Sequence, residues 1–165
     1  MIYDACLILC GAIAASGAIT GQACNGAGNI VSTNTIDLGP AGLGGLPGQL
    51  GDIGSGKLIV VDFHVRTAPT VGTSVQFQLI QADDPALTVN VQVLVSSGDI
   101  PIASLPAGRH VYLELAPLPF AARRYFGARI VNVGAIATFS VYAAVVADAQ
   151  SPLDRTLLRS GYGMA

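Results

Sequence analysis

Short runs of alternating apolar and polar residues dominate the second half of the chain. In residues 74–81, Val75, Phe77 and Leu79 lie on one face and alternate with glutamines. A period of two over such short runs is typical of half-buried strands in an antiparallel sheet. Similar runs, rich in β-branched and aromatic residues, occupy residues 57–66, 88–95, 109–115, 123–131 and 138–146.

These runs predict an all-β fold. No segment carries a convincing apolar stripe with the 3.6-residue period of an amphipathic helix. About seven or eight strands, separated by turns roughly every 8–15 residues, predict an antiparallel β-sandwich or jelly roll. The pattern does not separate these two architectures.

Glycine-rich segments interrupt the first half of the chain. Residues 21–35 are polar and glycine-rich and predict a loop, and residues 39–56 predict a long surface loop. Residues 51–57 match the phosphate-loop pattern G-x-x-x-x-G-K, but Leu58 replaces the Ser or Thr that binds Mg²⁺. The residues that follow resemble a strand, whereas a phosphate loop opens a helix. We therefore reject a nucleotide site.

Two terminal segments flank the predicted core. Residues 5–19 are continuously small and apolar, but Asp4 stands where a signal peptide carries Lys or Arg, and the stretch is shorter than the roughly 20 residues of a membrane span. We expect an N-terminal arm, or first strand plus loop, over residues 1–29, a core over 30–148 and a C-terminal arm over 149–165. A signal peptide is the alternative for the first segment, and a disordered tail is the alternative for the last.

The low proportion of charged residues changes this picture. Only 11% of residues are charged, against about 25% in typical globular chains. Either the surface is rich in small residues, or much of it is buried against other chains; we favour burial, because large apolar surfaces usually mark interfaces. The net charge of −2 argues against a nucleic-acid binder, which normally carries a basic stripe.

The cysteines and histidines offer little chemistry. Cys6, Cys10 and Cys24 are odd in number and unevenly spaced, so we interpret them as small apolar residues in a reducing compartment. Asp62 and His64 share one strand face and could be two metal ligands, but a cupin-like enzyme needs further convergent ligands. We interpret them, and His110, as solvent-facing polar residues. A His₃ site on the axis of a trimer is the exception to consider.

The remaining acidic pair also predicts structure, not catalysis. Asp83 and Asp84 precede Pro85, so they are interpreted as turn formers and not as an acid/base pair. No G-x-S-x-G motif is present, and no Cys–His pairing is indicated by position. We therefore predict a protein that is not an enzyme and that uses no cofactor and no metal.

A series of short motifs resembles a known family. In order, these motifs stand at residues 1–5, 32–39, 51–54, 81–84, 97–101, 105–108 and 124–125. Their order and spacing resemble the capsid cement, or decoration, proteins of tailed bacteriophages, over a region from Met1 to about Asp148. The resemblance implies a jelly-roll core that assembles as a homotrimer on the outside of the capsid and bridges subunits of the major capsid protein.

The resemblance also implies a location and a set of contacts. The protein would be made in the host cytoplasm and reside on the virion exterior, without direct contact with nucleic acid or membrane. A jelly-roll carbohydrate-binding or adhesion module is the alternative function, although Trp, a common sugar platform, is absent. We place the contacts with the shell or with other subunits on the termini, at Ile2, Tyr3, Arg155, Leu158, Arg159 and Tyr162.

Overall fold

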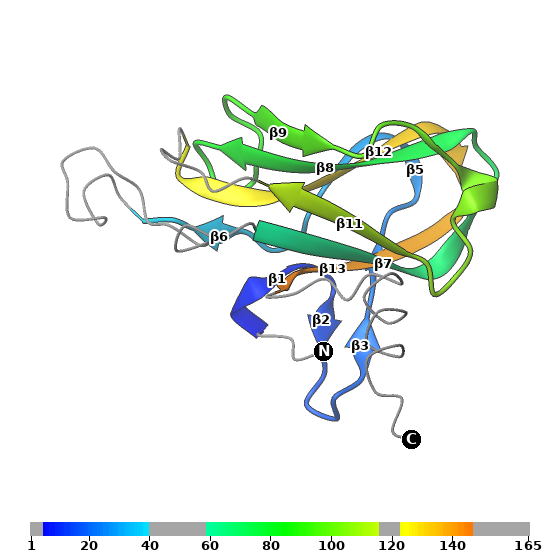
Figure 1. Cartoon of the computed structure of the whole chain (residues 1–165), viewed down its shortest axis with the longest axis horizontal. Helices are drawn as coiled ribbons and strands as arrows, with labels where there is room; N and C mark the ends of the chain where they lie inside the picture. The colour runs from blue at the N-terminus through cyan, green and yellow to red at the C-terminus, as the bar shows by residue number, and fades with distance from the viewer. Residues whose placement is uncertain (1–4, 40–58, 116–122, 147–165) are drawn as a thin grey trace, which may run out of the picture.

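The computed structural model describes residues 5–39, 59–115 and 123–146 of the chain. Its strands form two antiparallel sheets that face each other (Figure 1), which confirms the predicted all-β sandwich. In the described part of the chain, the helical segments are two single 3₁₀ turns, η1 (Ala5–Leu7) and η2 (Ile102–Ser104). Neither has the length and hydropathy of a membrane span.

The first sheet, here called the β7 sheet, has the strand order β1-β13-β7-β11, and β4 also pairs with β13. Its strands are β1 (Ile8–Cys10), β4 (Gln22–Ala23), β7 (Ile59–Thr70), β11 (His110–Leu115) and β13 (Thr138–Val146).

The second sheet, here called the β8 sheet, has the order β10-β8-β12-β5, with β9 paired to β8 and β6 paired to β12. Its strands are β5 (Gly26–Val31), β6 (Ile36–Asp37), β8 (Ser74–Ala82), β9 (Gln92–Ser96), β10 (Ile100–Pro101) and β12 (Tyr125–Ile136). A separate hairpin consists of β2 (Ala12–Ile13) and β3 (Ile19–Thr20).

The core lies between the two sheets and is built from the alternating apolar positions. Phe77 of β8 is fully buried, with its ring centroid 5.0 Å from that of Phe63 on β7 and 6.4 Å from that of Phe139 on β13. Phe77 therefore packs across the sandwich against two strands of the opposite sheet. Other fully buried members are Val61, Val65, Val75, Leu79, Leu105, Phe126, Ala128, Ile130, Val141 and Ala143.

Several predicted element boundaries were wrong. The strand predicted at 123–131 continues to Ile136, because the absent side chain of Gly134 allows close approach to Gly72 and a φ of +87°. The strand predicted at 88–95 begins only at Gln92, because the backbone N–H groups of Thr88 and Val89 donate to Asp84 in a turn.

The loop predicted at residues 21–35 contains two strands, β4 and β5. Glycine did not prevent strand formation here, because β12 provides the partner for β5. The Asn132 side chain of β12 also donates to the carbonyl oxygens of Cys24 and Gly26, at 2.8 and 3.0 Å, which fixes the start of β5. The glycine-rich loop predicted at 39–56 lies outside the described residues, except for Gly39.

The turn between β8 and β9 covers the outer face of the β8 sheet. Leu87, buried despite a φ of +57°, packs against Ile80 and Ala82. A Cβ atom at Gly127 would overlap the Leu87 side chain, so the absence of a side chain there lets Leu87 pack closely on the sheet. Asp84 closes this turn through hydrogen bonds from the Thr88 hydroxyl and two backbone N–H groups, which confirms its predicted turn-forming role.

Candidate functional site

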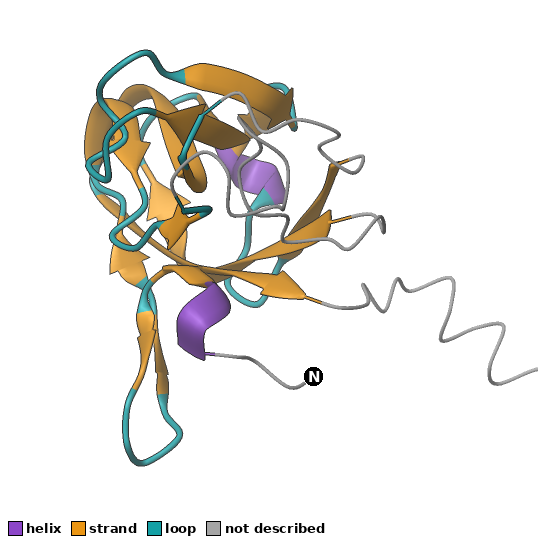
Figure 2. Ribbon diagram, turned by 90° about the vertical axis from the view of Figure 1, so that its left-hand side faces the viewer, coloured by secondary structure: helices purple, strands orange, loops and turns teal. Residues whose placement is uncertain are grey.

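The β2–β3 hairpin, residues 11–21, projects from the body of the sandwich and is here called the arm (Figures 1 and 2). The backbone N–H of Ala14 donates to the carbonyl of Ala18, and that of Gly17 donates to the carbonyl of Ala14, both at 2.8 Å. These bonds close the turn at its tip. The side chains exposed along the arm are all small and uncharged: Ala12, Ala14, Ala15, Ser16, Ala18 and Thr20.

The base of the arm is anchored on the outer face of the β7 sheet. Ile13 and Ile19 pack against a cluster formed by Ile8, Tyr142 and Ala144. A Cβ atom at Gly11, whose φ is +86°, would overlap the carbonyl oxygen of Thr20 and press on the Tyr142 ring. Close backbone contact at Gly11 therefore fixes the direction in which the arm projects from the sheet.

Two side chains tie the arm to the body by hydrogen bonds. The guanidinium of Arg66 on β7 donates to the carbonyl oxygen of Ile19 at 3.4 Å, and the amide of Asn34 donates to that of Gly11 at 3.2 Å. An isolated two-stranded hairpin is marginally stable in water. These contacts, together with the apolar base, supply the order that the arm cannot supply alone.

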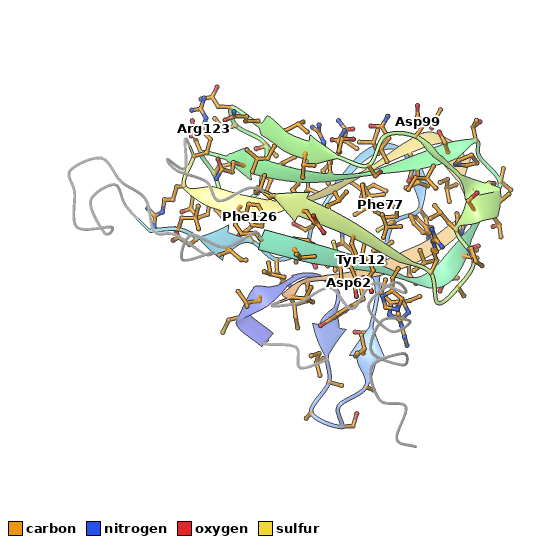
Figure 3. The ribbon with its side chains drawn as sticks, viewed as in Figure 1. Asp62, Phe77, Asp99, Tyr112, Arg123 and Phe126 are labelled. Carbon is orange, nitrogen blue, oxygen red and sulfur yellow. The ribbon has the colours of Figure 1, made fainter. Side chains whose placement is uncertain are left out.

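A polar and aromatic cluster lies beside the arm on the same sheet face. His64 on β7 is paired with His110 on β11 and, on its other side, with Tyr142 on β13. Asp62 on β7 is paired with Tyr112 on β11. Figure 3 labels Asp62 and Tyr112 close together on this side of the sandwich. Side chains paired across adjacent strands point to the same face, so sheet topology gathers these five residues.

The interpretation of Asp62 as solvent-facing was wrong. Its side chain is only 1% exposed, and both carboxylate oxygens lie 2.9 Å from Nδ1 of His110. The His64 ring stacks on the His110 ring, with centroids 4.3 Å apart and an interplanar angle of 8°. Burial is explained by position: β7 lies between β13 and β11, and aromatic side chains on both strands flank the carboxylate.

The cluster is a packing and hydrogen-bonding feature. Among the described residues, no three His, Cys, Asp or Glu side chains converge in a way that could hold a metal ion. His64 and His110 present parallel rings to each other, so their nitrogens are not directed at one common point. A buried carboxylate beside a histidine fixes the orientation of the imidazole.

The pKa of His64 lies below its ordinary value of 6.5, because burial and then the nearby His110 and Arg66 disfavour the protonated ring. As pH falls through about 6.5 the unfolded chain binds this proton first, so stability present near neutral pH is lost on acidification. We expect the urea midpoint to fall between about pH 7.5 and pH 5.5. The corresponding fall in the free energy of unfolding should be less than about 1 kcal/mol, because the half-exposed ring is solvent-screened.

Substituting His64→Gln should remove part of that fall. Asp37→Asn is the matched control, because the pKa of Asp37 is lowered to about 2, mainly by the Arg124 side chain, and its contribution is lost only as pH falls below about 4. If the urea midpoint of the natural chain does not change between about pH 7.5 and pH 5.5, the lowered pKa of His64 is contradicted.

The three cysteines differ in accessibility. Cys10 and Cys24 are buried in the core, and burial raises the pKa of both thiols, that of Cys24 to about 12, whereas Cys6 is exposed. This confirms the apolar role predicted for the two buried residues. Because the thiolate is the reactive form, Ellman's reagent should modify Cys6 rapidly in the native protein and the other two only after unfolding.

The Cys6→Ser variant should lose the rapid phase of that reaction and keep the slow one. A native protein that releases more than one equivalent of thionitrobenzoate in the rapid phase would show that the N-terminal segment opens in solution. Such opening would contradict the burial of Cys10 in β1.

Two ion pairs hold the start of β12. Arg123 donates to both oxygens of Asp83, at 2.8 and 3.0 Å, and Arg124 donates to both oxygens of Asp37, each at 2.7 Å. Both pairs are largely exposed, so solvent screening leaves each a small contribution to stability. They fix geometry, joining β12 to the β8–β9 turn and to β6.

The contact residues predicted from the sequence lie outside the described residues. They are Ile2, Tyr3, Arg155, Leu158, Arg159 and Tyr162. The structure therefore leaves these six as predictions. The sequence analysis did not predict the β2–β3 hairpin. Its turn is indicated by the Ser16–Gly17 pair, which lies between the apolar pairs at residues 12–13 and 18–19.

Fold and surface together define an all-β antiparallel sandwich with an uncharged projecting arm. The chain belongs to the Bbp16 family, because the model of that family matches residues 14–146. The matched region begins inside the arm and ends with β13, so it spans almost all of the described structure. A search of curated proteins found no match.

Proposed function

We propose that this chain is a structural virion protein, a capsid cement protein that trimerises on the outer capsid surface and bridges subunits of the major capsid protein. The observation that carries the proposal is the uncharged arm projecting from a tightly packed sandwich. An exposed, ordered and apolar projection is costly for a monomer in water, and such surfaces usually mark interfaces.

The strand order supports a jelly-roll form of this proposal. The sheets have the orders β1-β13-β7-β11 and β10-β8-β12-β5, so β5, β7 and β8 alternate between sheets, as do β11, β12 and β13. Such alternation is expected when Greek-key connections join two sheets. The ordered series of motifs that resembles phage cement proteins is a second, independent support.

The proposed mechanism is mechanical. A stiff body carries identical contact surfaces in three-fold symmetry, and each surface binds a different capsid subunit. Three linked contacts raise the overall affinity by roughly 10²–10⁴ over one contact. Bridging subunits that internal pressure pushes apart raises the barrier to rupture. The proposal requires no catalysis, no cofactor, and no contact with nucleic acid or membrane.

The proposal is tested by mass and binding. Light scattering at micromolar concentration should give about three times the chain mass of 16.8 kDa. The protein should then co-sediment saturably with shells of the source phage from which it has been stripped. A protein that ignores such shells but binds glycans on an array would overturn the proposal in favour of the adhesion module.

A further inference from the structure

We propose that the arm of each copy docks along the open edge of β5 in the next copy of this chain. The inference rests on the proposed trimer and names the surfaces that build it. The contact is heterologous, because a hairpin on one copy meets a different surface on its neighbour. Such contacts repeat head to tail and close into a ring when the rotation allows.

The outer edge of β5 offers the first surface. β5 is the last strand of the β8 sheet and pairs with β12 on one side. The N–H of Ser32 donates to Ala128 on β12, whereas the carbonyl of Val31 accepts from the Gln22 side chain and so points away from β12. Alternation then directs the backbone groups of Asn29 to the open edge. Beyond Asn29 the ladder is irregular, because Gly28 and Gly26 have positive φ angles and the register with β12 shifts between them.

This edge carries no charged and no proline side chain, two of the devices that usually protect an edge strand against pairing with another chain. A bulge at Gly26–Gly28 interrupts the ladder with β12, so the regular part of the edge lies around Asn29. Here Gly26, Ala27, Gly28 and Asn29 are exposed, and none of them is charged or proline. Within the described residues, no strand pairs with the outer edge of β5. An edge left open in this way is a template for a neighbouring strand.

The arm offers the matching surface. Because Ala14 bonds to Ala18 across the hairpin, alternation turns the backbone of Ile13 outward, on the edge of β2 away from β3. Its exposed side chains are no larger than threonine, so a partner backbone can approach closely. The arm is also held rigidly at its base, which reduces the entropy that docking must overcome.

The absence of charge on both surfaces and their positions on the body indicate that the arm docks on a second copy of this chain. No charged residue lies between Asp4 and Asp37, a stretch that contains both the arm and β5. The arm extends from the outer face of the β7 sheet, whereas β5 is an edge of the β8 sheet and lies on another side of the body (Figure 1). The arm therefore projects away from β5 of its own copy, and we assign the contact to a neighbouring copy.

The test is site-directed cross-linking with a short bismaleimide, in solution and on shells. Cys6→Ser removes the exposed thiol, and Ala14→Cys and Asn29→Cys are then introduced singly and together at exposed positions. The double variant should yield covalent dimers and trimers, whereas each single variant should yield monomers. Mixing the two single variants should yield dimers only.

Two results would overturn the inference. One is a double variant that has the mass of a trimer but forms no cross-link; this outcome leaves the cement function intact. The other is self-cross-linking of a single variant, which would indicate a two-fold contact. A chain that is monomeric in solution and does not bind shells would instead overturn the proposed function.

A charge substitution gives an independent readout. Ala14→Asp should weaken trimerisation by about tenfold or more, because the carboxylate is buried without a partner. Ala103→Asp, at an exposed position of η2 away from both surfaces, is the matched control and should trimerise normally. Natural trimerisation should also change little with salt concentration, because no ion pair contributes to it. Equal trimerisation of the two variants would contradict the proposed contact.

Discussion

Replacing Phe77 with alanine is expected to lower the free energy of unfolding by about 3–5 kcal/mol. The ring is fully buried and contacts Phe63 and Phe139 on the opposite sheet. Its removal leaves a cavity between two sheets whose hydrogen-bonded strands cannot collapse to fill it. Urea denaturation followed by circular dichroism measures the loss directly.

The control for that experiment is Val133→Ala. Val133 also lies on a strand of the β8 sheet but is 41% exposed, so the expected change is within about 0.5 kcal/mol. Comparable losses in the two variants would mean that the core is not centred between the sheets at Phe77, and would contradict the sandwich packing.

Replacing Gly11 with alanine is expected to displace the arm. The new Cβ atom would overlap the carbonyl of Thr20, and the residue would remain at a φ of +86°. Neither the backbone of β3 nor the Tyr142 ring can move aside without breaking the base of the arm. We expect faster proteolysis within residues 11–21 and at least about a tenfold loss of trimer affinity, while the sandwich stays folded.

Gly17→Ala is the matched control for this prediction. Gly17 also has a positive φ, of +81°, but a Cβ atom there would meet no other atom within 4 Å. This variant carries the conformational strain of about 1–2 kcal/mol without the overlap. If both variants lose the arm equally, strain alone determines its stability and the close contact at Gly11 is unimportant.

The strands with strict alternation were predictable from sequence. β8 and β13 lie almost where the pattern placed them, because every second side chain enters one core. β5 was not predictable, since Gly26, Ala27 and Gly28 carry no periodic signal, and only pairing with β12 makes the segment a strand. The strand predicted to end at residue 131 continues to Ile136 for a related reason: the β7–β8 turn packs closely against Gly134, a contact that the local sequence does not indicate.

The surroundings of Asp62 show the same limit at the candidate site. Asp62 and His110 lie 48 residues apart in sequence, and only the register of β7 with β11 brings them together. Local sequence around Asp62 indicated an exposed strand face, because polar residues at every second position usually face water. Long-range pairing therefore decides whether such a face is solvated.

We propose that this chain reinforces a shell, and heating shells with and without it is the decisive test. Stripped shells of the source phage would be heated with saturating protein, and rupture followed by light scattering or release of packaged DNA. We expect a higher rupture temperature with the natural chain and little gain with Gly11→Ala. A rupture temperature that does not change at saturating concentrations of the natural chain would contradict the cement function.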